Sequence, residues 1–89
     1  MYTAHAKVRM QQRAIPSSVV NLLLDYGERT PAGRGGEIFY FGRRGRQRVC
    51  RSKGQAISQR LEGHWRDYVI VADGRVVTCG KRYRRIRRS

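Results

Sequence analysis

Acidic residues are scarce in this sequence. Six Asp and Glu side chains face twenty Lys and Arg across 89 residues, which gives a formal net charge of +14. The acids are scattered, so no carboxylate pair predicts glycosidase or metal-nuclease chemistry. A polyanionic partner is expected, and nucleic acid is the commonest one. On charge alone, an anionic membrane surface or an acidic protein would also fit.

Lysine is rare as well and occurs only at positions 7, 53 and 81. Arginine therefore supplies most of the charge. Its planar guanidinium can contact a phosphate through two hydrogen bonds and can stack on bases. The balance between the two residues favours a nucleic acid over the other polyanions.

Cysteines and long apolar runs are also few. Cys50 and Cys79 lack close spacing, and the sequence has no Cys/His cluster of the kind that binds zinc. Neither a metal nor a cofactor is expected, and Cys79 is interpreted as a small apolar strand residue. No run has transmembrane length, and the first ten residues lack the apolar region of a signal peptide. These absences predict a cytoplasmic protein that does not bind membranes.

Two amphipathic helices are predicted at the N-terminus. Thr3 can cap a first helix over about 4–14, which Pro16 ends. A second helix runs from Pro16 to the residue before Gly27, a typical residue after a helix end. Its apolar residues share one face: Val19, Leu22, Leu23 and Tyr26.

The middle of the chain gives weaker signals. The glycine-rich segment 30–36 predicts a flexible connection, and the aromatic segment 37–41 predicts a strand. Residues 42–48 predict a basic turn, which 48–51 could follow as a returning strand. A short helix is predicted over 54–63.

A β-hairpin is predicted over 67–82. The sequence Asp73-Gly74 favours a two-residue type I′ turn between two apolar runs. The resulting cross-strand pairs are Ala72–Arg75, Val71–Val76, Ile70–Val77 and Val69–Thr78. With this register, Thr78 lies on the same face as Val69 and Val71.

Together these elements predict an α+β fold in which two N-terminal helices pack on one face of a small antiparallel sheet. We expect one domain over residues 1–83, followed by a basic tail over 84–89.

Four segments together resemble a family of small bacterial proteins classed as a domain of unknown function. They are HAKVRMQQRAIP (5–16), LLLDYG (22–27), GGEIFYFGRR (35–44) and VVTCGKRYRRI (76–86). Members typically open with His-Ala-x-x-Arg-Met-x-x-Arg-Gly-Ile and close with a Val-Thr-x-Gly-His-Arg-like strand. The family is similar to the RelE/ParE toxin superfamily. This sequence departs from the pattern at Ala14, where glycine is usual, and at Lys81, where histidine is common.

The resemblance implies a RelE-like fold and a toxin that acts on RNA, as a metal-independent endoribonuclease, with an acidic antitoxin protein as partner. Two alternatives stay open at this point. One is a nucleic-acid-binding protein of the same fold without catalysis. The other is a ParE-like toxin that binds a protein target.

RNA cleavage without a metal needs a base, an acid and cations around the phosphate. Histidine can serve as acid or base because its pKa is about 6.5, and the sequence has two, His5 and His64. His5 shares a helical stripe with Arg9 and Arg13, because these residues are four apart. The alternative is structural: His5 caps or packs near the start of the helix, and the two arginines are simply solvated. His64 is interpreted as an ordinary surface histidine.

The candidate site follows from these considerations. The predicted catalytic residues are His5, Thr78 and Lys81, and the role of Thr78 is implied by the resemblance. The predicted nucleic-acid-binding residues are Arg9, Arg13, Arg43, Arg44, Arg82, Tyr83 and Arg85. Trp65 could stack on a base or pack in the core.

Overall fold

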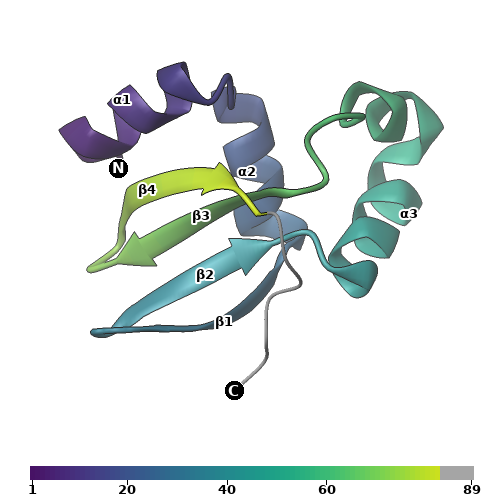
Figure 1. Cartoon of the computed structure of the whole chain (residues 1–89). Coiled ribbons are helices and arrows are strands. Elements are labelled where there is room, and N and C mark those ends of the chain that lie inside the picture. The colour runs from purple at the N-terminus through teal and green to yellow at the C-terminus, as the bar shows by residue number, and fades with distance from the viewer. Residues whose placement is uncertain (83–89) are drawn as a thin grey trace.

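The computed structural model describes residues 1–82, which form three helices and one four-stranded antiparallel sheet (Figure 1). The elements are α1 (Ala4–Gln12), α2 (Ser17–Tyr26), β1 (Glu28–Gly33), β2 (Gly36–Tyr40), α3 (Arg43–Arg60), β3 (Asp67–Ala72) and β4 (Arg75–Lys81). The strands lie side by side in chain order. The α+β class and the antiparallel sheet are therefore confirmed. Tyr83, Arg85 and the predicted tail over 84–89 lie outside the described residues.

The two predicted N-terminal helices are confirmed. The hydroxyl of Thr3 accepts a hydrogen bond from the N–H of Ala6 at 3.1 Å and caps α1. The N–H of Thr3 also donates to the carbonyl of Val76 at 3.0 Å, which fixes the start of the chain against β4. In Figure 1, α2 crosses behind the sheet, α1 lies beside β4, and α3 stands at the end of the sheet where β2 ends.

The core lies between the sheet and the helices, where each amphipathic element removes its apolar face from water. Its buried members are Ala6, Ile15, Val19, Val20, Leu23, Phe41, Val49, Leu61, Val69, Val76 and Cys79. Trp65 packs against this cluster and meets the ring of Phe41 edge-on, with ring centroids 5.3 Å apart. The packing role considered for Trp65 is therefore the one that the structure shows.

Three predictions for the middle of the chain are wrong. Most of the expected flexible connection belongs to β1, an edge strand that pairs with β2 and can therefore include Pro31. The expected turn over 42–48, apart from the N-cap residue Gly42, and the expected strand over 48–51 belong to α3. The C-terminal part of α3 includes most of the short helix predicted over 54–63. The strand predicted over 37–41 is confirmed as β2 to within one residue.

The predicted hairpin is confirmed, but its register is only half right. Asp73 and Gly74 both have positive φ, as a type I′ turn requires. The pairs Val71–Val76 and Ala72–Arg75 form as expected, and then a β-bulge makes Val77 an extra residue on β4. Ile70 consequently pairs with Thr78, and Val69 pairs with Cys79.

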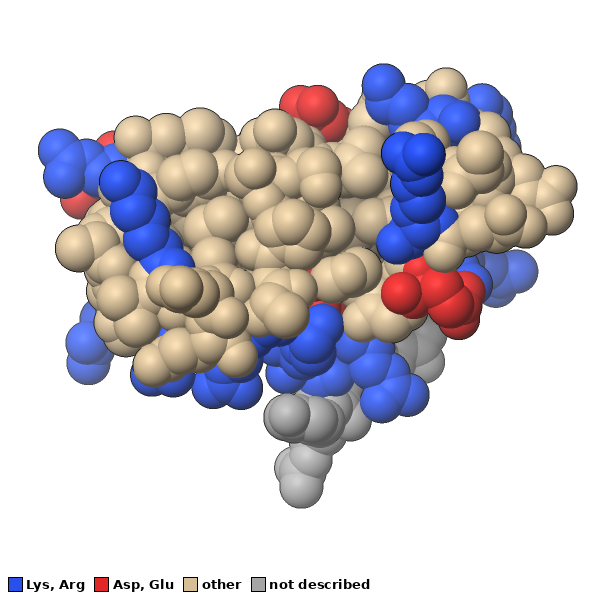
Figure 2. All heavy atoms as spheres, turned by 90° about the horizontal axis from the view of Figure 1, so that it is seen from above, with Lys and Arg blue, Asp and Glu red and all other residues tan. Residues whose placement is uncertain are grey.

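Charged side chains are unevenly spread over the surface. Lys and Arg gather along the lower edge of the face seen in Figure 2, whereas the middle of that face carries mostly other residues. Within residues 1–82, no helix is long and apolar enough to cross a membrane.

Candidate functional site

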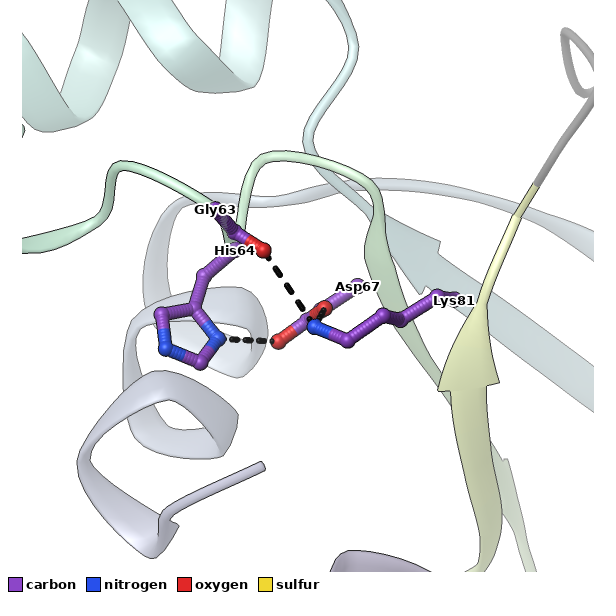
Figure 3. Close-up of polar contacts among 4 residues, drawn as sticks. All are labelled: Gly63, His64, Asp67 and Lys81. Atoms are coloured by element: carbon purple, nitrogen blue, oxygen red, sulfur yellow. Dashed lines mark hydrogen bonds and ion pairs between the residues drawn. The ribbon is translucent and has the colours of Figure 1, made fainter. Parts of the chain in front are cut away.

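The carboxylate of Asp67, the first residue of β3, is completely buried and lies between two basic side chains (Figure 3). One oxygen accepts a hydrogen bond from the ammonium of Lys81 at 2.7 Å, and the other lies 2.7 Å from Nδ1 of His64. A buried carboxylate is costly unless it is paired and hydrogen-bonded. The two contacts meet that requirement, and the three residues form a connected polar cluster, which we call the Asp67 cluster.

Three parts of the chain build the Asp67 cluster. Asp67 and Lys81 are cross-strand partners in β3 and β4, so the sheet itself brings their side chains together. His64 comes from the turn after α3, where its N–H donates to the carbonyl of Leu61 at 2.7 Å. The ammonium of Lys81 also donates to the carbonyl of Gly63 at 3.2 Å. The cluster therefore fastens this turn to the end of β4.

His64 has the geometry of an oriented acid or base. A neutral imidazole that donates Nδ1–H to a carboxylate keeps a lone pair on Nε2, and the carboxylate also fixes the ring orientation. Figure 3 shows the second ring nitrogen on the side of the ring away from Asp67. The side chain of His64 is 23% exposed, so it is held in place and still reaches the surface.

His64 lines an open groove of about 620 Å³ between α1 and the start of α2. The groove walls are mainly apolar and include Met10, Ala14, Ile15 and Pro16. Lys7 lines the same groove as His64, so the groove carries a positive charge as well as the imidazole. An oriented imidazole beside a groove that contains a cation can exchange a proton with a bound hydroxyl and stabilise nearby negative charge.

The structure brings Lys81 into the Asp67 cluster but places the other two predicted catalytic residues elsewhere. His5 is exposed on α1, where its Nε2 lies 3.5 Å from Nε of Arg9. Thr78 pairs with Ile70 and so lies on the sheet face opposite Lys81 and Val69, since strand residues alternate between faces. The expectation that Thr78 shares a face with Val69 is therefore wrong.

Of the predicted stripe, Arg9 lies in α1 and Arg13 is its C-cap residue, and the charges of both act on Cys79 in β4. Burial raises the pKa of the Cys79 thiol, and the negative charge of Asp67 acts in the same direction. The positive charges of Arg13 and Arg9 oppose this rise. These two arginines thus contribute positive potential at Cys79 in β4.

The remaining predicted binding residues occupy different environments. Arg43 and Arg44 are exposed in the first turn of α3. Arg82 is half-buried, donates to the carbonyl of Phe41 at 2.6 Å and lies over the ring of Tyr40 at 5.4 Å. Burial lowers the pKa of its guanidinium. One guanidinium N–H of Arg82 is therefore used by the protein itself, whereas its Nε is buried without a hydrogen-bond partner among residues 1–82.

The sequence analysis did not single out Asp67, and it interpreted His64 as an ordinary surface histidine. In the structure His64 is half-buried and hydrogen-bonded to Asp67. The available signal was an acid that opens the apolar strand DYVIV and stands three residues after a histidine. An acid at the start of a central strand is buried with that strand and needs a partner, and the nearby histidine is the first one to consider.

Within residues 1–82, no three His, Cys, Asp or Glu side chains gather closely enough to hold a metal ion. Comparison of the chain with protein-family models, with curated proteins and with solved structures finds no match.

Proposed function

We propose that this protein binds nucleic acid, specifically RNA, as the resemblance to RelE-like toxins implies. The observation that carries the proposal is the charge left at the surface after folding. Two of the six acids, Glu28 and Asp67, are buried, whereas most arginines remain exposed. The folded surface is therefore poorer in exposed acids than the composition suggests. A basic surface of this kind attracts the phosphate backbone whatever the base sequence.

The experiment measures affinity for a short single-stranded RNA by fluorescence anisotropy at increasing salt. Arginine–phosphate contacts release counterions, so the logarithm of the binding constant falls linearly with the logarithm of salt concentration. An uncharged peptide nucleic acid of the same sequence is the matched control and is expected not to bind. RNA affinity that does not change with salt, or equal binding of the uncharged strand, contradicts the proposal.

Metal-independent RNA cleavage is a second candidate function, and the pairing of His64 with Asp67 favours it. Nε2 of His64 takes the proton of an RNA 2′-hydroxyl, and that oxygen attacks the adjacent phosphorus. The bond from phosphorus to the 5′ oxygen breaks, water supplies a proton to the leaving oxygen, and the resulting hydroxide takes back the proton that His64 had accepted. The products are a 2′,3′-cyclic phosphate and a free 5′-hydroxyl. Lys7 supplies positive charge to the crowded phosphate.

The two histidines provide matched variants for the cleavage test, carried out in EDTA. His64→Ala is expected to lose ~10²–10⁴-fold in cleavage rate with unchanged RNA affinity, whereas His5→Ala keeps its rate. Asp67→Asn is expected to lose a similar factor in cleavage rate. The amide N–H of the new side chain donates to Nδ1 of His64, which leaves the ring proton on Nε2. Melting temperatures of all three variants identify any loss that comes from unfolding.

If cleavage is instead lost in His5→Ala and kept in His64→Ala, the acid–base role belongs to His5, the histidine that the sequence analysis favours. If the wild type cleaves no RNA, with or without ribosomes, the catalytic candidate is rejected and binding alone stands.

A further inference from the structure

A second cavity, of about 460 Å³, lies on another part of the molecule, between the end of α2, the β1–β2 edge of the sheet and the first turns of α3. Unlike the groove beside His64, it is lined mainly by polar groups. Three arginines contribute to its lining, Arg29 from β1 and Arg44 and Arg48 from α3. We call this cavity the arginine pocket.

The three arginines reach the pocket from two sides. Arg44 and Arg48 are four residues apart, so they lie on one face of α3. The guanidinium of Arg48 donates to the carbonyl of Tyr26 at 3.5 Å, which holds it against the end of α2. Arg29 lines the pocket from the edge strand, where its Nε lies 3.8 Å from the carboxylate of Glu37.

The start of α3 lies close to the pocket because Gly45 has no side chain. A Cβ atom at this position would be 3.2 Å from the carbonyl oxygen of Tyr26 and 3.3 Å from the Cα of Gly27. A larger residue would force α3 and the α2–β1 junction to shift apart by a few tenths of an ångström. The glycine therefore permits the close approach of α3 to this junction.

Two carboxylates also line the pocket, and they occupy different positions. Glu28 is buried and accepts a hydrogen bond from the N–H of Gly45 at 3.4 Å, in the first turn of α3. A negative charge is favourable there because of the helix dipole, so Glu28 serves the fold. Asp25 is exposed near the end of α2, and its negative charge partly offsets the positive charge of the three guanidinium groups in the pocket.

We propose that the arginine pocket binds a phosphate group of RNA between Arg44 and Arg48 on one side and Arg29 on the other. This inference rests on the proposed RNA-binding function and identifies a site for it. Guanidinium groups can each donate two parallel hydrogen bonds to phosphate oxygens. Groups that converge from two walls hold a phosphate in a fixed position, which scattered surface arginines do not.

The test compares two double variants that remove the same charge from the same helix. Arg44→Ala with Arg48→Ala deletes two arginines of the pocket. Arg51→Ala with Arg60→Ala deletes two exposed arginines of α3 that do not line it. Each lost phosphate contact reduces the salt slope of RNA binding by about one. We expect a reduction of about two in the pocket variant and much less in the control variant. Equal losses in the two variants overturn the proposal, even where RNA binding itself is confirmed.

A titration with inorganic phosphate separates the pocket from the function. On the wild type, we expect phosphate to shift the NMR resonances of the Arg44 and Arg48 side chains before those of Arg51 and Arg60. Asp25→Asn should tighten this binding, because it removes an opposing charge. Phosphate shifts in the pocket without any RNA binding support the pocket and contradict the proposed function. RNA binding without such shifts, or with shifts spread over all arginines, overturns the pocket.

Discussion

Ala14 shows how a single residue can carry backbone strain in this fold. It lies between α1 and α2 and has a φ of 52°, in the left-handed region that suits glycine. Its N–H donates to the carbonyl of Gln11, and the next N–H, of Ile15, donates to that of Met10, so the turn is fixed on both sides. Glycine would adopt this backbone conformation without steric cost.

We therefore predict that Ala14→Gly stabilises the protein. An L-residue in the left-handed region costs about 1–2 kcal/mol, and relief of this strain is partly offset by the greater chain entropy of glycine in the unfolded state. The expected net gain is about 0.5–1 kcal/mol, or a rise of a few degrees in melting temperature.

Ala56→Gly is the matched control for this prediction. Ala56 is exposed in α3, where glycine is disfavoured, so this change should lower stability by about 0.5–1 kcal/mol. Thermal unfolding of the two variants against the wild type measures both effects. A melting temperature of Ala14→Gly at or below that of the wild type contradicts the strain argument.

At the scale of whole elements, the sequence predicts α1, α2, β2 and the β3–β4 hairpin because each depends on local signals. Thr3 supplies a cap, Pro16 separates the helices, and Asp73-Gly74 supplies a turn. Each signal acts within a few residues of the chain, so it can be recognised without knowledge of the tertiary structure.

The first part of helix α3 could not be predicted in this way because tertiary packing overrides its local preferences. Its first part contains several arginines, and Gly45 interrupts them, a composition that suggests a turn. Burial of Val49 and the close approach at Gly45 stabilise the helix instead. At Gly54, φ is 80° and the helix is sharply kinked, so that Sγ of Cys50 lies 2.7 Å from Oγ of Ser58. Residues eight apart in a straight helix are separated by about 12 Å along its axis.

The bulge in β4 shows why the candidate site was only partly predictable. An ideal two-residue hairpin predicts the pairs near the turn, but one extra residue at Val77 moves each later side chain to the other face. Thr78 therefore leaves the core face, and Lys81 reaches Asp67. No local signal in the run RVVTCGK marks the bulge, so the contact between Lys81 and Asp67 required the structure.

At the scale of the whole molecule, the excess of positive charge affects binding and folding in opposite ways. Residues 1–82 carry sixteen of the twenty Lys and Arg and all six acids, a formal net charge of +10, and the radius of gyration is 12.3 Å. This dimension is close to the Debye length of about 10 Å at 0.1 M salt. Like charges on this protein therefore repel one another with little screening when salt is low. A polyanion that binds the surface relieves the same repulsion.

We predict that added salt stabilises the fold while it weakens RNA binding. Raising sodium chloride from about 0.02 M to about 0.5 M shortens the Debye length several-fold, so repulsion among the exposed arginines falls and the melting temperature should rise. The contacts between the buried carboxylate of Asp67 and its two half-buried partners should weaken little, since salt screens such contacts much less than exposed ones. Scanning calorimetry at both salt concentrations measures the effect, and RNA titrations under the same conditions give the opposing trend. A melting temperature that falls with salt would show that attractive ion pairs outweigh the repulsion. Such a result would also remove the reason to expect that bound RNA stabilises the protein chiefly through relief of its own charge.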